Sequence, residues 1–64
     1  MWTTVYVASG IETAREIEKQ LVEEGFMVQV KYFASENGEE LYELLVPRFE
    51  AEEIQLCLIE LGII

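Results

Sequence analysis

Few side chains in this 64-residue sequence could do chemistry at neutral pH. The sequence contains no histidine and no aspartate, one cysteine (Cys57) and two lysines, Lys19 and Lys31. Without histidine it lacks the usual general base near pH 7, the commonest zinc ligand and any catalytic constellation built on histidine. Catalysis would have to rest on glutamate, tyrosine, lysine or the single thiol.

Cys57 and the acidic turn around Asn37 are the two candidates for a reactive or metal-binding site. Cys57 lies at helical spacing among apolar residues with no cationic neighbour, so we expect a small buried side chain rather than a reactive thiol. Glu36, Glu39 and Glu40 flank the turn, but the alternating ligands of a calcium loop are absent. We therefore expect a solvated turn, no metal and no cofactor.

The composition is at once apolar and acidic. Hydrophobic residues make up 52% of the chain, and 13 glutamates against 4 lysines and arginines give a net charge of −9. This charge argues against a nucleic-acid partner and against anionic membranes, because both bind through lysine and arginine. No apolar run approaches the roughly 20 residues of a membrane-spanning helix, and the first residues do not resemble a signal peptide, so we expect a cytoplasmic protein.

A chain of this length predicts a single domain, residues 1–64, that cannot hide all of its apolar side chains. Such a domain buries only about 60% of the surface that its unfolded chain exposes. Some apolar side chains should therefore remain on the surface.

Residues 2–8 alternate in a β-strand pattern, with Val5 and Val7 on the expected core side. Ser9 and Glu12 form the pattern of a capping box, which predicts a helix that begins here and is ended by Gly25.

Residues 26–35 and 39–46 read as two strands of a hairpin. A two-residue Asn-Gly loop would place Lys31 opposite Leu44 and mix charge into the core. A three-residue loop instead pairs residues whose numbers sum to 74, including Val30 with Leu44 and Phe33 with Leu41. We therefore predict the three-residue loop.

Residues 49–61 predict a second helix, which Gly62 ends. The order strand, helix, strand, strand, helix implies an α+β fold, a two-layer ferredoxin-like α/β sandwich with sheet order 1-3-2 and both helices on one face. The first strand is then an open edge. Ile63 and Ile64 could begin a fourth strand that covers it.

Two apolar surfaces are expected to lack cover in the monomer. One is the sheet face away from the helices, and the other is the outer side of the last helix. The predicted interface residues on these surfaces are Trp2, Tyr6, Phe33, Leu41, Leu45, Phe49, Leu56 and Ile59.

Five stretches carry a resemblance to a known family: WTTVY (2–6), ETA (12–14), LVEEG (21–25), YELLVP (42–47) and AEE (51–53). With these motifs the chain resembles a small bacterial family of proposed signal-transducing proteins whose function is unknown. The resemblance implies a sandwich similar to the nitrogen regulatory PII proteins and a regulatory or binding role. Some members of the family are labelled glutamate decarboxylase.

We reject the decarboxylase label, because that chemistry needs a Schiff-base lysine and donors for the cofactor phosphate. Lys19 lies on a charged helix face and Lys31 opposite Glu43, as ordinary surface residues do. We expect a noncatalytic regulatory or protein-interaction module that acts as a homodimer, with a further protein or small-molecule ligand left open. The alternative is a small enzyme or enzyme subunit that uses glutamate and tyrosine groups in a dimer cleft.

Overall fold

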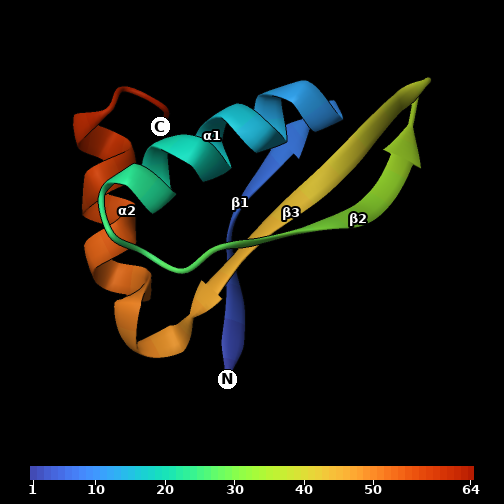
Figure 1. The fold of residues 1–64 in the computed structure, drawn as a ribbon. Coiled ribbons are helices and arrows are strands. Elements are labelled where there is room, and N and C mark those ends of the chain that lie inside the picture. The colour runs from blue at the N-terminus through green and yellow to red at the C-terminus, as the bar shows by residue number, and fades with distance from the viewer.

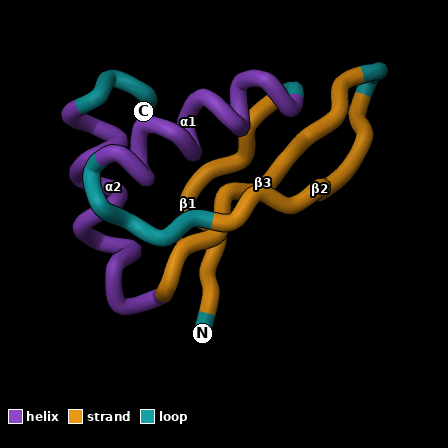
Figure 2. Tube along the Cα trace, viewed as in Figure 1, coloured by secondary structure: helices purple, strands orange, loops and turns teal.

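The computed structural model describes residues 1–64 and confirms the predicted βαββα architecture (Figure 1). Its elements are β1 (Trp2–Ser9), α1 (Ile11–Glu23), β2 (Gln29–Glu36), β3 (Glu39–Pro47), a 3-10 turn (Arg48–Glu50) and α2 (Ala51–Glu60). The three strands form one sheet in the order β1-β3-β2, and β3 is antiparallel to both neighbours. Figure 2 shows the hairpin of β2 and β3 reaching beyond the helices at its tip.

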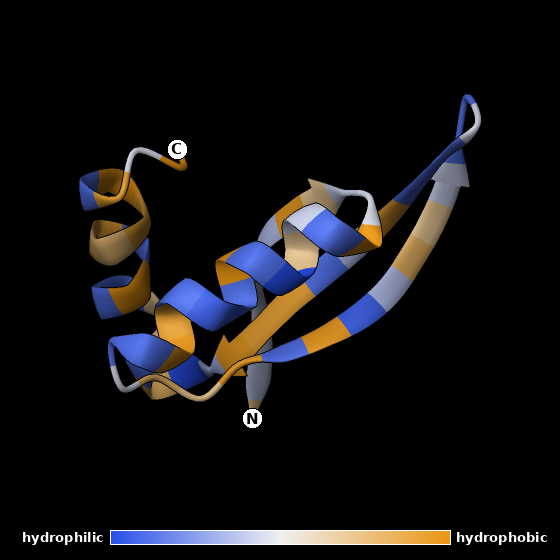
Figure 3. Ribbon diagram, turned by 45° about the horizontal axis from the view of Figure 1, so that its top comes forward, coloured by the Kyte–Doolittle hydropathy of each residue, from blue (hydrophilic) through white to orange (hydrophobic).

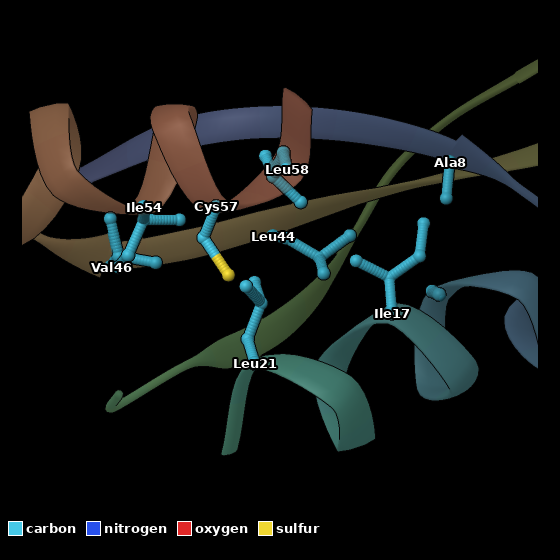
Figure 4. Close-up of a cluster of buried hydrophobic side chains, with 9 residues drawn as sticks. Ala8, Ile17, Leu21, Leu44, Val46, Ile54, Cys57 and Leu58 are labelled. Atoms are coloured by element: carbon cyan, nitrogen blue, oxygen red, sulfur yellow. The ribbon is translucent and has the colours of Figure 1, made fainter. Parts of the chain in front are cut away.

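Both helices pack on one face of this sheet and enclose a single hydrophobic core (Figure 4). Leu21 of α1 and Leu58 of α2 meet Leu44 of the central strand, and all three are fully buried. The nine core residues are Ala8, Ala14, Ile17, Leu21, Leu44, Val46, Ile54, Cys57 and Leu58. The other face of the sheet has no layer over it.

The start of α1 differs from the predicted capping box. Ser9 is the last residue of β1, and the N-cap is Gly10, which makes no side-chain cap hydrogen bond. The amide of Gly10 donates to the carbonyl of Glu40 at 2.8 Å, so strand pairing continues to the edge of the helix. Gly10 then turns the chain with φ 87° and ψ 143°, a backbone conformation that residues other than glycine rarely adopt.

The predicted three-residue hairpin loop is wrong, although the predicted pairing holds for the body of the strands. Asn37 and Gly38 form a two-residue turn with φ of 52° and 81°. The residues on either side of this turn, Glu36 and Glu39, pair with each other. A β-bulge at Phe33 then shifts the pairing by one residue, so that Tyr32 still lies opposite Tyr42. Because of this bulge the hairpin can have a two-residue turn while Val30 still pairs with Leu44 on the core face.

A second bulge, at Val5 of β1, overturns the predicted faces of that strand. Val5 and Tyr6 together oppose Leu44, and both pack against the core. Val7 pairs with Glu43 instead and is 42% exposed. The prediction that Val7 faces the core and Tyr6 the open side is therefore wrong.

The predicted glycines follow both helices, each two residues after the last helical residue. Gly25 and Gly62 have φ of 96° and 78°, and the amides of the following residues, Phe26 and Ile63, donate to the carbonyls of Leu21 and Leu58. This arrangement turns Phe26 and Ile63 back against the core.

The predicted second helix is too long at both ends. The α-helix spans Ala51–Glu60, with Phe49 in the preceding 3-10 turn and Leu61, which is exposed, after the last helical residue. Ile63 and Ile64 form no strand, so β1 remains an open edge of the sheet. No helix has the length and apolar character needed to cross a bilayer.

Candidate interaction surface

The sheet face opposite the helices carries apolar side chains from all three strands. Residues paired across an antiparallel sheet share a face, and Leu45 and Glu43 alternate with the buried Leu44 and Val46 of β3. We call the residues that pair on this side the open face. They are Trp2, Thr4, Val7 and Ser9 of β1, Gln29, Lys31, Phe33, Ala34 and Glu36 of β2, and Glu39, Leu41, Glu43, Leu45 and the buried Pro47 of β3.

Four of the five sheet residues predicted for an interface lie on the open face: Trp2, Phe33, Leu41 and Leu45. Phe33 is 53% exposed because it stands in the bulge, where it and Ala34 together oppose Leu41. Tyr6 lies on the other side of the sheet. Val7 lies on the open face in place of Tyr6, and sequence reasoning missed it. The bulge at Val5 causes this exchange of Tyr6 and Val7, and no glycine or proline in the sequence marks it.

The charged groups of the open face are one lysine, Lys31, and three glutamates, Glu36, Glu39 and Glu43. Thr4 Oγ1 donates to Glu43 Oε2 at 3.2 Å, and Lys31 pairs with Glu43 in the strand register. Lys31 nevertheless makes no salt bridge, since Arg15 with Glu18 at 2.9 Å is the chain's only ion pair. The open face therefore has a net negative charge, and its one cation has no carboxylate partner.

The second predicted apolar surface also exists, on the outer side of α2. Phe49 is 85% and Leu56 60% exposed, and Ile59 lies one turn further along the helix. A shallow depression of about 390 Å³ beside them is lined by Ala51, Glu52, Gln55, Leu56 and Ile59. Figure 3 shows hydrophobic colour on α2 as well as along β3, whereas the visible side of α1 and the hairpin tip are mostly hydrophilic.

A further shallow groove runs between Tyr6 and the first turns of α1. It measures about 420 Å³ and is lined by Tyr6, Glu12, Thr13, Glu16, Ile17, Gln20 and Ile63. Its two carboxylates and the lack of any lysine or arginine make it a poor site for an anionic metabolite. Tyr6, predicted as an interface residue of the open face, thus contributes to a different surface.

Cys57 is buried as predicted, and its sulfur points toward Leu21 (Figure 4). Burial raises the pKa of the Cys57 thiol, and the charges of Glu24 and Glu60 raise it further. The thiolate is the reactive form, so this environment suppresses reaction.

We expect the native thiol of Cys57 to react with Ellman's reagent at pH 8 at least about tenfold more slowly than the thiol of the urea-unfolded chain. Unfolding removes both the burial and the nearby carboxylates. Equal rates in the two states would show that the thiol is accessible in the folded protein.

Tyr42 and Glu40 form the only tyrosine–carboxylate hydrogen bond. Tyr42 Oη donates to Glu40 Oε1 at 3.2 Å, while its ring meets Tyr32 edge-on with centroids 5.8 Å apart. Desolvation and then the charge of Glu40 raise the pKa of Tyr42. A phenol with a raised pKa is a weaker acid, so the pair is poorly suited to proton transfer, whereas the ring contact of Tyr42 with Tyr32 joins β3 to β2.

The remaining titratable groups do not converge on a common centre. Lys19 and Glu23, four residues apart on α1, form no ion pair, and no group of three or more potential metal ligands gathers anywhere in the chain. Glu50 Oε1, near the start of α2, is the only buried side-chain oxygen without a hydrogen-bond partner.

No protein-family model matches this chain, and no match was found among curated proteins or solved structures.

Proposed function

We propose that this chain is a noncatalytic regulatory or protein-interaction module that acts as a homodimer in the cytoplasm. The observation that carries the proposal is the apolar surface left without cover: thirteen large hydrophobic side chains are exposed, against nine buried hydrophobic residues in the core. Large apolar patches on small monomers mark interaction sites or aggregation hazards. The sequence resemblance to signal-transducing proteins is the basis for proposing a regulatory role.

The charge of the chain supports a protein partner over a polyanion. A net charge of −9 repels nucleic acids and anionic membranes, and it also keeps apolar surfaces from random association. Three surfaces could form the dimer: the open face, the outer side of α2 and the free edge of β1.

The alternative function, a small enzyme or enzyme subunit using glutamate and tyrosine groups in a dimer cleft, finds no specific support. The one tyrosine–carboxylate pair joins two residues of the same strand, Glu40 and Tyr42, rather than lining a cavity, and the grooves are shallow. A decarboxylase would also need a Schiff-base lysine, and we propose no such role for Lys19 or Lys31.

The oligomeric state tests the proposal. Light scattering on the purified protein at concentrations from about 10 to 500 µM should show a mass that rises from the 7.4 kDa monomer toward twice that value. Native mass spectrometry of the same sample would detect a retained small-molecule ligand. A monomeric mass over the whole range would contradict the homodimer.

A further inference from the structure

The free edge of β1 lies in the longest uncharged stretch of the chain. Residues 1–11 contain no acidic or basic side chain, whereas every other element carries at least one glutamate. β1 pairs only with β3, so the backbone groups on its other side have no strand partner. Natural proteins place charged residues or proline on an exposed edge to prevent pairing with another chain. β1 contains neither, so its edge is open to an added strand.

The hydrogen-bond pattern shows which backbone groups of β1 point to this edge. The amide of Gly10 donates to β3 at 2.8 Å. In the same register, Ala8 and Tyr6 also belong to hydrogen-bonded pairs, because such pairs recur at every second residue of an antiparallel ladder. The amides and carbonyls of Val7 and Ser9 therefore point away from β3. At a spacing of two residues they present the regular groups that another strand can pair with.

The bulge at Val5 limits this regular edge to the second half of β1. Pairing with β3 is uninterrupted over Tyr6–Ser9, and the bulge lies just before this segment. The other edge strand, β2, is better protected, because it has a bulge at Phe33 and charged side chains at Lys31 and Glu36. Tyr6–Ser9 is thus the segment of the sheet best suited to strand addition.

An acidic groove lies beside the same segment, on the helix side of the sheet. Tyr6 is the β1 residue of the groove of about 420 Å³, and most of its other lining comes from α1. Glu12 and Glu16 are exposed there, and no lysine or arginine lines the groove. Successive side chains of a strand point to opposite faces, so every second residue of an added strand would point toward this groove. A lysine or arginine at those positions would meet two carboxylates.

A second copy of this chain offers no such strand. β1 itself carries no charged side chain, and of the four lysines and arginines only Lys31 lies in a strand. Lys31 is on the open face and not on the side of the groove. The net charge of −9 also favours a basic partner over another acidic chain. The edge of β1 is therefore suited to a different protein.

We propose that the free edge of β1 binds an extended basic segment of another protein. The segment pairs with Tyr6–Ser9 as an additional strand and directs lysine or arginine side chains toward Glu12 and Glu16. In this mode of recognition, backbone hydrogen bonds give affinity and side-chain contacts give specificity. The inference rests on the proposed interaction module and not on the homodimer, for which the open face and the outer side of α2 remain.

A synthetic peptide tests the charge requirement. The probe is a fluorescent peptide of about eight residues, a common strand length, in which lysine alternates with valine or threonine. Its control has glutamate in place of lysine. Fluorescence anisotropy should give a dissociation constant at least about tenfold lower for the lysine probe than for the glutamate probe. Equal binding of the two, or no binding of the lysine probe, would overturn the proposal.

Variants of the groove test where the lysine probe binds. Glu12→Gln combined with Glu16→Gln should weaken its binding at least about fivefold. The matched control, Glu24→Gln with Glu53→Gln, removes the same charge from exposed positions that line a different depression, and it should change binding by less than about twofold. Equal weakening by the two double variants would show that net charge attracts the probe and that the groove is not its site. Circular dichroism checks that each variant is folded.

Methylated probes test strand addition itself. Only alternate amides of an added strand face β1, so methylation of either the lysine amides or the amides between them should abolish binding in one case only. Both modifications leave the charge unchanged. Loss through the valine and threonine amides indicates an antiparallel strand, and loss through the lysine amides a parallel one. An equal effect of the two modifications would contradict strand addition.

A change in the edge itself identifies the strand that the probe joins. Val7→Pro removes an outward amide of β1 without removing a hydrogen bond to β3, and it should weaken binding of the lysine probe at least about tenfold. Val7→Thr keeps the amide and should leave binding within about twofold of the original. Equal binding to a folded Val7→Pro variant would show that the probe does not pair with β1.

Light scattering with and without the lysine probe separates this inference from the homodimer. A monomeric chain that binds the probe supports strand addition and contradicts the homodimer. A dimer that does not bind the probe supports the homodimer and contradicts strand addition. If the probe converts a dimer into monomers, the edge of β1 forms the dimer contact, and its assignment to another protein is wrong.

Discussion

Leu44→Ala is expected to lower the free energy of unfolding by about 2 to 5 kcal/mol. Leu44 is fully buried on the central strand, where it faces Val5 and Tyr6 across the register and contacts both helices' core residues. A domain of 64 residues has a total stability of roughly 3 to 10 kcal/mol. The substitution should therefore remove a large part of that stability and leave a measurable unfolded population without denaturant.

Urea denaturation followed by circular dichroism measures this loss. The protein concentration should be well below the dimer dissociation constant, because dimerisation would add to the apparent stability. Leu56→Ala is the matched control, since Leu56 is 60% exposed on α2 and its truncation should change stability by less than about 0.5 kcal/mol. Similar losses for the two variants would show that the core is not where the structure places it.

Gly10→Ala is expected to destabilise the protein by about 1 to 3 kcal/mol. Gly10 joins β1 to α1 with φ 87° and ψ 143°, and a Cβ atom built there meets no other atom within 4 Å. The cost thus comes from backbone strain and not from a steric clash. The strain would be relieved only if the end of β1 or the first turn of α1 moved.

Ser9→Ala provides the comparison for Gly10→Ala. A capping box at Ser9 would make this substitution cost about 1 kcal/mol, but Ser9 ends β1 and caps no helix, so we expect a change below about 0.5 kcal/mol. Thermal unfolding of the two variants side by side measures the order of the effects. A larger loss for Ser9→Ala than for Gly10→Ala would support the capping box over the observed Gly10 turn.

The element order and the sheet order could be predicted because they depend on features that act over a few residues or on general rules of chain topology. Apolar spacing in α1, with Ala14, Ile17 and Leu21 on one side, specified its buried face, and Gly25 specified its end. The hairpin then required β2 and β3 to be antiparallel, a right-handed crossover made β1 parallel to β2, and insertion of β3 between them gave the order 1-3-2. The elements followed from local sequence, and their order in the sheet followed from these topology rules.

The turn and the bulges could not be predicted together, because strand faces were assigned by strict alternation. Asn37-Gly38 is the usual sequence of a two-residue turn, yet it was rejected since an unbroken register would have placed Lys31 in the core. The bulge at Phe33 removes that conflict without any glycine or proline to signal it. An extra residue in a strand changes which side chains face the core, and alternation alone cannot locate it.

The same limitation explains the composition of the open face. Trp2, Leu41 and Leu45 were correctly placed because they lie outside the bulged steps, and Phe33 remained on this side because a bulge residue and its successor oppose the same partner. Tyr6 and Val7 were exchanged because the bulge at Val5 precedes both. Because of the bulge, Val5 and Tyr6 both pack against the core. This packing depends on Leu44, which lies 38 residues after Tyr6 in the chain.

The amino-acid sequence by itself determined the order of the elements, their approximate ends, the burial of Cys57 and the surplus of apolar side chains. These follow from spacing, turn residues and the small size of the domain, all of which are local or compositional. Only the tertiary structure decided which residues form the open face, where β1 passes into α1, and that Lys31 has no partner in its own chain. These depend on how β3 is packed between two bulged strands, and such long-range contacts are settled when the whole core assembles.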